Sequence, residues 1–246
     1  MTKKLTKRKL FTWIISIFLV VVIFVKISLY SQDYYRASAS AMDYINNPAP
    51  GVTVEDKRDT IVFTPENVEA GFIFYPGGMV EPEAYAPLME QLAENGVECI
   101  VIKMPHYLAF FDANGARGIQ QKYPEIDKWY IGGHSLGGAM ASMYGNLHAK
   151  EYEGVIFLAA YATNDMTDKD IKALLIRGDQ DGVLNMDRYN ESFANLPKET
   201  KEVVIKGGCH AYFGDYGPQF NDGTPNITVE EQTQQTLAEI VDFIKE

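Results

Sequence analysis

The sequence predicts a doubly wound α/β domain with a mostly parallel sheet, preceded by an N-terminal transmembrane helix. From residue 52 onward, short runs of β-branched and aromatic residues alternate with longer segments of helical periodicity. Several of the short runs are almost continuously apolar, as in strands that are covered by helices on both faces. One apolar run near the N-terminus is also long enough to cross a bilayer.

The N-terminal 30 residues differ sharply from the rest of the chain. Residues 1–9 carry a cluster of Lys and Arg, and residues 10–30 form a largely apolar run with Lys26 near its end. A helix over 10–30 would span about 31 Å at about 1.5 Å per residue, which matches a hydrocarbon core. Basic residues before such a helix stay cytoplasmic, so we expect a single-pass signal-anchor in the cell membrane with an extracytoplasmic body. A cleaved signal peptide is the alternative.

The remaining chain is strongly acidic. Residues 31–246 contain 16 basic and 33 acidic residues, a net charge of -17. Such a surface is repelled by nucleic acid, so no nucleic-acid partner is expected. No His/Cys cluster has the spacing of metal ligands, and we predict no metal and no cofactor. Cys99 and Cys209 are expected to be unpaired thiols, one in a strand and one in a loop.

The elements follow one another with few interruptions. Residues 31–51 are rich in Ser, Ala, Asn and Pro and are expected to form a linker, so the folded domain would cover 52–246. Thr228 and Glu231 form a capping box at the start of the last helix. Strands are predicted at 60–65, 71–76, 97–104, 129–133, 154–160, 171–178 and 201–207. Helices are predicted at 84–95, 112–122, 135–149, 187–196 and 228–245.

One glycine-rich segment, Gly133-His134-Ser135-Leu136-Gly137, lies between a predicted strand and a predicted helix. In open α/β sheets, ligands bind at such junctions, at the carboxyl ends of the strands. The two glycines would permit a tight turn that projects the Ser135 hydroxyl above the sheet. This pattern is typical of a nucleophile, although a serine in an ordinary glycine-rich turn has the same local sequence.

In this strand–turn–helix context, the pentapeptide resembles the nucleophile elbow of the α/β-hydrolase fold superfamily. The resemblance covers roughly residues 52–246. The stretches YPGGMVEPEAYAPLMEQLAENG, KMPHYLAFFDANGA and GGCHAYFGDYG are similar to a bacterial group of serine hydrolases near the dienelactone hydrolase-like proteins. Dienelactone hydrolases themselves use a cysteine nucleophile where this chain has Ser135, so the resemblance does not imply their substrate.

The resemblance implies a catalytic triad in the chain order Ser, acid, His. Ser135 would be the nucleophile, and His210, which follows the last predicted strand, would be the base. Asp181 fits the family's G-x-x-D-x-V pattern after the strand at 171–178. Asp179 and Asp165 remain alternatives for the acid.

The other three histidines are expected to lie outside the triad. His106 would lie in a loop at the strand edge, and His148 would lie late in the helix that follows the elbow. His134 is expected to point away from the catalytic cleft.

The resemblance also implies an oxyanion hole made of two backbone N–H groups. One would belong to Leu136, and the other would come from the loop Pro76-Gly77-Gly78-Met79. We expect Met79 to donate, with Gly78 as the alternative.

The implied function is a serine esterase, a hydrolase that cleaves carboxylic esters through an acyl-enzyme. The connection at 161–170 is too short to build a large lid, so small or peripheral acyl groups are expected. Tyr107, Phe110 and Tyr212 are candidates for binding a small-molecule ester. An acyltransferase of the same fold and a catalytically silent binding protein are the alternatives. The oligomeric state stays open.

Overall fold

The computed structural model describes residues 34–246 together with residues 13, 17, 18 and 20. The basic tail 1–9, most of the expected anchor 10–30 and the first residues of the expected linker lie outside the described residues. Among the residues that are described, no helix combines the length and the apolar character needed to cross a membrane. The chain divides into two units, and Tyr34–Glu246 is the folded domain.

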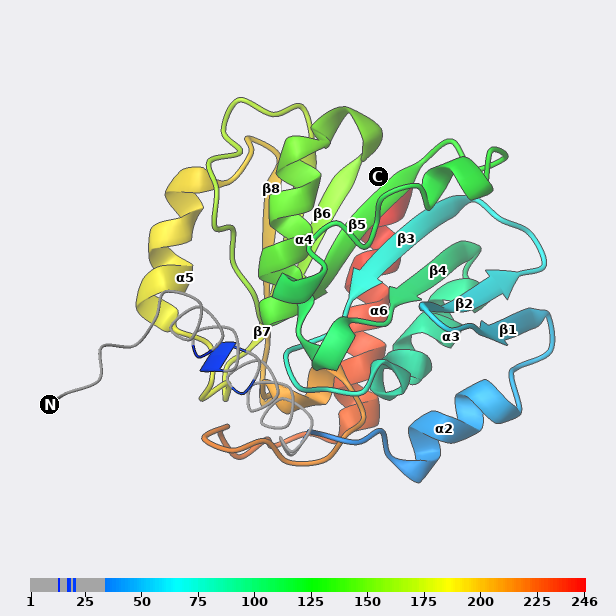
Figure 1. The fold of residues 1–246 in the computed structure, drawn as a ribbon, viewed down its shortest axis with the longest axis horizontal. Coiled ribbons are helices and arrows are strands. Elements are labelled where there is room, and N and C mark those ends of the chain that lie inside the picture. The colour runs from blue at the N-terminus through cyan, green and yellow to red at the C-terminus, as the bar shows by residue number, and fades with distance from the viewer. Residues whose placement is uncertain (1–12, 14–16, 19, 21–33) are drawn as a thin grey trace, which may run out of the picture. The chain divides into compact units, whose positions relative to one another are not determined.

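An eight-stranded sheet in the order β1-β2-β4-β3-β5-β6-β7-β8 forms the centre of this domain (Figure 1). β3 to β8 are parallel, whereas β2 runs antiparallel to β4 and to β1. The mostly parallel sheet confirms the α/β fold that the sequence predicts. The strands are β1 (Val52–Asp56), β2 (Thr60–Pro65), β3 (Ala70–Tyr75), β4 (Val97–Ile102), β5 (Trp129–His134), β6 (Gly154–Leu158), β7 (Lys172–Gly178) and β8 (Thr200–Ile205).

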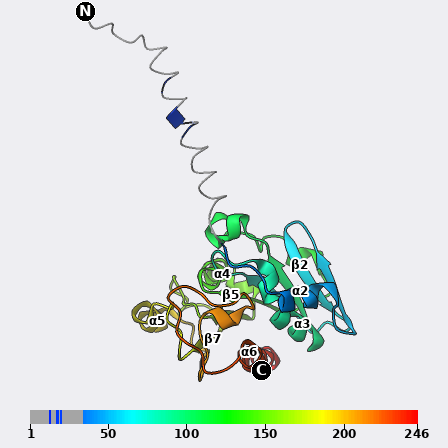
Figure 2. The same cartoon turned by 90° about the horizontal axis from the view of Figure 1, so that it is seen from below.

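Helices cover both faces of the sheet, with α3 and α6 on one face and α4 and α5 on the other. Figure 2 shows α4 and α6 on opposite sides of the strands. Side chains alternate between the two cores along β3, where Phe72 and Phe74 point to the α3/α6 side and Ile73 points to the α4 side. The helices are α2 (Ala39–Asn46), α3 (Ala86–Glu94), α4 (Leu136–Leu147), α5 (Met186–Ser192) and α6 (Val229–Lys245).

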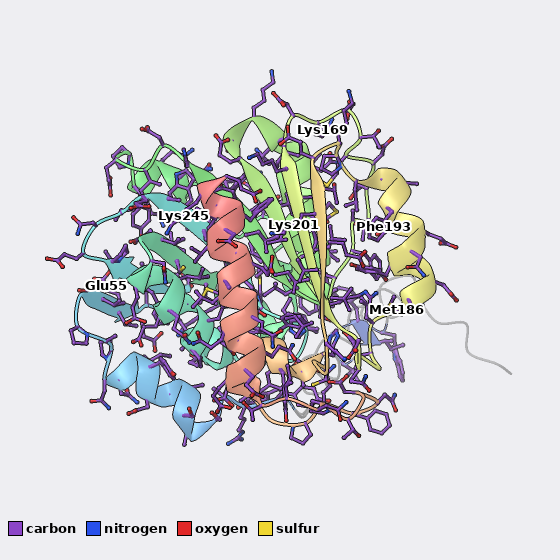
Figure 3. All side chains as sticks on the ribbon, turned by 180° about the vertical axis from the view of Figure 1, so that it is seen from behind. Glu55, Lys169, Met186, Phe193, Lys201 and Lys245 are labelled. Atoms are coloured by element: carbon purple, nitrogen blue, oxygen red, sulfur yellow. The ribbon has the colours of Figure 1, made fainter. Side chains whose placement is uncertain are left out.

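Helix α6 begins at the predicted capping box. The Thr228 hydroxyl accepts the Glu231 N–H at 3.2 Å, and the Glu231 carboxylate accepts the Thr228 N–H at 2.8 Å. At the other side of the helix, Lys201 of β8 forms an ion pair of 2.8 Å with Glu239. Figure 3 shows α6 lying along the back of the sheet. The ion pair therefore links α6 to β8, and the capping box fixes where α6 begins.

The helix predicted at 112–122 is wrong. This segment consists of turns, with a single 3-10 turn at Gln120–Lys122, and Gly118 has a φ of +76°. The Tyr75 hydroxyl replaces helical hydrogen bonds, because it donates to the Ala113 carbonyl at 3.1 Å and accepts the Ala116 N–H at 2.9 Å. A buried side chain from β3 thus decides the backbone of a segment that has helical periodicity.

Residues 34–51 differ from the expected spacer. They include α2, in which Ala41 is fully buried and the Ser38 hydroxyl caps the first turn. The Tyr35 N–H donates to the Met79 carbonyl at 2.7 Å, and the Tyr35 carbonyl accepts the Glu81 N–H at 2.9 Å. The domain therefore begins near residue 34, beside the loop that follows β3. Strand β1 was also missing from the sequence prediction, since only two of its five residues are apolar.

Candidate active site

Ser135 lies at the sharp turn between β5 and α4, with φ 52° and ψ -123°. This backbone conformation is strained for a residue with a Cβ and is typical of functional sites. The Ser135 N–H donates to the Leu158 carbonyl of β6 at 2.9 Å, and the Ser135 carbonyl accepts the Ala139 N–H at 3.1 Å. Neighbouring strand and helix thus hold the serine at the carboxyl edge of the sheet.

The glycines on both sides of the serine are required by close backbone contacts. A Cβ on Gly133 would lie 2.4 Å from the Tyr75 carbonyl oxygen. A Cβ on Gly137 would lie 2.1 Å from that oxygen and 2.2 Å from the Pro76 carbonyl oxygen. Distances this short exclude any side chain, so the elbow is pressed directly against the end of β3.

The loops after β7 and β8 bring Asp181 and His210 together. His210 Nδ1 lies 2.8 Å from Asp181 Oδ2, and both side chains are 1% exposed. The other carboxylate oxygen of Asp181 accepts the N–H groups of Val183 at 2.9 Å and Leu184 at 2.8 Å. An ionised carboxylate only accepts, so this hydrogen bond assigns a proton to His210 Nδ1, and in the neutral ring Nε2 then carries the lone pair. Nε2 is buried and has no hydrogen-bond partner among the described residues.

The two alternative acids do not contact His210. The Asp179 carboxylate accepts the Gly207 N–H at 2.7 Å and the Gln180 side-chain amide at 3.0 Å. The Asp165 carboxylate caps an exposed turn through the N–H and hydroxyl of Thr167. Of the three aspartates, Asp181 is therefore the one that can orient the imidazole.

His134 is buried, and its ring packs against that of His210. The two rings are 4.6 Å apart between centroids, and His134 is 1% exposed. The Tyr85 hydroxyl accepts the Gly77 N–H at 2.9 Å and is hydrogen-bonded to His134 Nδ1, also at 2.9 Å. Burial holds the pKa of His134 well below its usual range, and the neighbouring His210 lowers it further, so the ring is neutral.

The two candidate oxyanion donors in the glycine loop differ in their hydrogen bonds. The Met79 N–H donates to the Tyr107 carbonyl at 2.7 Å, so the expectation that Met79 supplies the donor is not supported. Among the described residues, neither the Gly78 nor the Leu136 N–H has an acceptor within hydrogen-bond distance. A Cβ on Gly78 would lie 3.1 Å from the Leu136 side chain, which places these two residues against each other. Of the candidate donors, Gly78 and Leu136 are therefore the two whose N–H groups form no hydrogen bond with another described residue.

The residues expected to bind substrate differ in burial and in the side chains that they contact. Tyr107 is half-buried, and its ring packs against that of Tyr34 in a tilted arrangement, with 4.4 Å between the centroids. Phe110 is 52% exposed, and Tyr212 packs partly into the core on the α6 side. Leu108, which the sequence prediction missed, comes near Gly78 and is a better candidate for the wall of the site.

Both thiols are free and buried, which agrees with the expectation that they are unpaired. Burial raises the pKa of Cys209 to about 12, with a smaller contribution from Asp222, so this neighbour of His210 is not a thiolate nucleophile at neutral pH. In the part of the chain that the structure describes, no group of three or more His, Cys, Asp or Glu residues could hold a metal ion.

Sequence reasoning missed two side chains that hold the His210 loop. Gln232 of α6 is fully buried, and its side-chain amide accepts the Cys209 N–H and donates to the Cys209 carbonyl, both at 2.9 Å. Asp222 accepts the His210 N–H at 3.2 Å. One signal could have revealed Gln232, because it lies on the same helical face as the buried Thr236 and Ile240.

The sequence profile of the alpha/beta hydrolase family matches residues 71–234. The chain belongs to the alpha/beta hydrolase family. No curated protein matches the sequence. The expected likeness to dienelactone hydrolase-like proteins stays a prediction.

Solved structures of this hydrolase fold are similar over most of their length. Est1E from Butyrivibrio proteoclasticus has a TM-score of 0.59 and 16% identity, covering 80% of this chain and 100% of Est1E. A CIB-like hydrolase from Thermoplasma acidophilum has a TM-score of 0.58 and 16% identity, covering 78% and 100%. The Est2 esterase from Thermogutta terrifontis has a TM-score of 0.53 and 16% identity, covering 79% and 93%. At these identities the likeness establishes the fold.

Proposed function

We propose that this alpha/beta hydrolase is a serine esterase that cleaves carboxylic esters of small or peripheral acyl groups through an acyl-enzyme. The single observation that carries the proposal is the buried pair of His210 and Asp181. It leaves His210 Nε2 as an unpaired buried acceptor at the edge of the sheet where Ser135 occupies a strained elbow.

In the proposed mechanism, His210 Nε2 takes the proton of the Ser135 hydroxyl as Oγ attacks the ester carbonyl. Asp181 holds the Nδ1 proton and stabilises the imidazolium that forms. The Gly78 and Leu136 N–H groups stabilise the oxyanion. His210 then gives the proton to the leaving alcohol, and water attacks the acyl-enzyme with His210 again acting as base.

The connection between β6 and β7 supports an acyl group that is small or peripheral. It runs from residue 159 to 171 and contains no helix, so it builds no large lid. Among the similar structures, Est1E has been solved with bound ferulic acid, and Thermogutta terrifontis esterase 2 has been solved phosphoramylated by tabun. These two ligands suggest esters of aromatic acids and organophosphorus reagents as probes for this chain.

We further propose that residues 10–30 anchor the protein in the cell membrane and leave the domain outside. The support comes from the sequence, namely the apolar run and the basic residues before it. The proposal is tested by membrane fractionation of the full-length chain, followed by protease treatment of intact cells. Release of the domain by protease is expected, whereas a soluble, full-length protein would contradict an anchor.

The nucleophile is tested with a fluorophosphonate probe on the full-length protein. We expect the probe to label Ser135, and we expect Ser135→Ala to lose both labelling and cleavage of p-nitrophenyl butyrate. Ser142→Ala is the matched control, because Ser142 is a buried serine of α4 whose hydroxyl donates to the Ala139 carbonyl. It should keep full labelling and activity.

The outcomes separate the three candidate functions. A folded wild type that neither binds the probe nor cleaves esters would identify a silent binding protein and overturn the proposal. Transfer of the acyl group to an added alcohol in preference to water would identify an acyltransferase.

A further inference from the structure

Asp222 differs from the other carboxylates near the site because its side chain accepts hydrogen bonds from four backbone N–H groups. It lies in a turn after the His210 loop, where its own N–H donates to the Gln219 carbonyl at 3.2 Å. The carboxylate oxygens accept the N–H groups of Gly182 at 3.1 Å, His210 at 3.2 Å, Ala211 at 2.8 Å and Gly223 at 2.8 Å. These four hydrogen bonds are all with main-chain N–H groups, and none is with the His210 ring. The Cys209 side chain is a further neighbour of the carboxylate.

Three of these four groups belong to the two loops of the proposed acid–base pair, and the fourth, Gly223, follows Asp222 in its own turn. Gly182 directly follows Asp181, and the N–H groups of His210 and Ala211 begin the short 3-10 helix after β8. The hydrogen bond between the Asp181 and His210 side chains is thus accompanied by a second link between the same two loops. Hydrogen bonds to an ionised acceptor are stronger than neutral ones, so this link is a stiff one.

The backbone around Asp222 fits closely against the Asp181 loop. A Cβ on Gly182 would lie 2.6 Å from the Asn221 carbonyl oxygen. A Cβ on Gly223 would lie 1.8 Å from the Gln180 carbonyl oxygen. Asn221 itself has a positive φ of 64°. The turn at 221–223 is therefore wedged against residues 180–182 and can move only if the Asp181 loop moves with it.

We propose that Asp222 is a positioning residue whose carboxylate ties the Asp181 loop to the His210 loop and so directs His210 Nε2 toward Ser135. The inference rests on the proposed function and adds to it a residue that never contacts the substrate. Removing the carboxylate would leave the Asp181–His210 hydrogen bond in place but would free both loops to shift. A misplacement of about 1 Å in a catalytic group can cost about 10²-fold in rate.

Asp222 is ionised under ordinary assay conditions. Burial alone would raise the pKa of its carboxyl, but the backbone hydrogen bonds outweigh burial and lower it below its usual value.

The test compares Asp222→Ala, Asp222→Asn and the control Asp179→Ala in the full-length protein. The Asp179 carboxylate also joins the loops after β7 and β8, through the Gly207 N–H at 2.7 Å, but it does not contact His210. We expect Asp222→Ala to lower kcat about 10²-fold with KM changed less than about twofold. Asp222→Asn keeps one acceptor oxygen, so its kcat should be about tenfold higher than that of Asp222→Ala. Asp179→Ala should keep wild-type kcat.

The rate of fluorophosphonate labelling gives a second measurement that does not depend on substrate binding. It should fall with kcat in Asp222→Ala, at a temperature where thermal unfolding shows the variant to be folded. A folded Asp222→Ala with wild-type kcat and labelling rate would overturn the inference, as would an equal loss in Asp179→Ala. If Asp222→Ala does not fold, Asp222→Asn provides the test. A wild-type kcat in Asp222→Asn would then overturn the inference. An inactive and unlabelled wild type would instead be a failure of the proposed function.

Discussion

The Ser135 turn is held by close steric contact with the end of β3, whereas the Asp181 and His210 loops are held together by hydrogen bonds to side chains. The serine turn depends on the glycines at 133 and 137, which press it against the end of β3. The Asp181 and His210 loops depend instead on side chains that accept or donate across long sequence separations, from Gln232 of α6 and from Asp222.

This difference has consequences for mutation. The serine turn is held by steric contacts so close that a single added Cβ atom would overlap the backbone of β3. It should therefore tolerate no substitution at its glycines. The other half is held by hydrogen bonds, which can be weakened one at a time. Substitutions of the elbow glycines should therefore prevent folding, whereas removal of single hydrogen bonds from the Asp181 and His210 loops should lower activity by degrees.

The largest effect is expected for Gly137→Ala. The added Cβ would lie 2.1 Å from the Tyr75 carbonyl oxygen, and neither strand nor helix can move away. We expect a loss of more than about 4 kcal/mol in the free energy of unfolding, or no soluble protein. Soluble yield and urea denaturation measure this.

The control for that variant is Gly217→Ala, where φ is +80° but no atom lies within 4 Å of the added carbon. Backbone strain alone should cost about 1–2 kcal/mol there. Equal losses in the two variants would show that close packing does not limit the elbow.

The next effect is expected for Asp181→Asn, which should fold normally. The Asn oxygen can still accept the Val183 and Leu184 N–H groups, but its NH2 group would face His210 Nδ1 and favour the wrong tautomer. By analogy with other triads, kcat should fall about 10⁴-fold. Steady-state kinetics with a p-nitrophenyl ester measure this, and Asp165→Asn serves as the control with unchanged kcat. An active Asp181→Asn would remove Asp181 from the mechanism.

Tyr85→Phe tests the contact between the glycine loop after β3 and His134 of the serine turn. The missing hydroxyl would leave the buried Gly77 N–H and His134 Nδ1 without partners. We expect a loss of about 2–4 kcal/mol in the free energy of unfolding. Tyr130→Phe is the control, because its buried hydroxyl makes a single bond of 3.2 Å to the Ile244 carbonyl. Chemical denaturation of both variants should show the larger loss in Tyr85→Phe, and the reverse order would contradict a structural role for this hydroxyl.

The smallest effect is expected at Glu98 of β4, which belongs to neither half of the site. Burial raises the pKa of its carboxyl to about 7, although a hydrogen bond from Thr64 opposes the shift. Because the folded-state value lies above the unfolded one, the contribution of Glu98 is fully present below about pH 4.5 and is lost as pH rises through about 7. The free energy of unfolding should therefore fall by about 1–3 kcal/mol between pH 5 and pH 8 through this group.

Glu98→Gln should remove that part of the pH dependence. Denaturation curves of the wild type and the variant at pH 5 and pH 8 measure it, with kcat unchanged at either pH. Identical pH dependence in the two proteins would mean that Glu98 does not titrate in this range.

The sequence by itself determined the alternation of strands and helices, the capping box of α6 and the position of Ser135 at a strand–helix junction. These features depend on residues within a few positions of one another, so periodicity and glycine spacing report them. The resemblance to the hydrolase fold also singled out Asp181 and His210, and the structure brings their side chains to 2.8 Å. Their catalytic roles stay predictions.

Only the tertiary structure decided the features that depend on distant side chains. The Tyr75 hydroxyl turned the predicted helix at 112–122 into a series of turns, and the Tyr107 carbonyl engaged the Met79 N–H. The Tyr85 hydroxyl is hydrogen-bonded to the His134 ring, and the Asp222 carboxylate accepts the Gly182 N–H. The physical reason is common to all four, because a single hydrogen bond from a residue 28 to 49 positions away leaves no periodic trace in the local sequence.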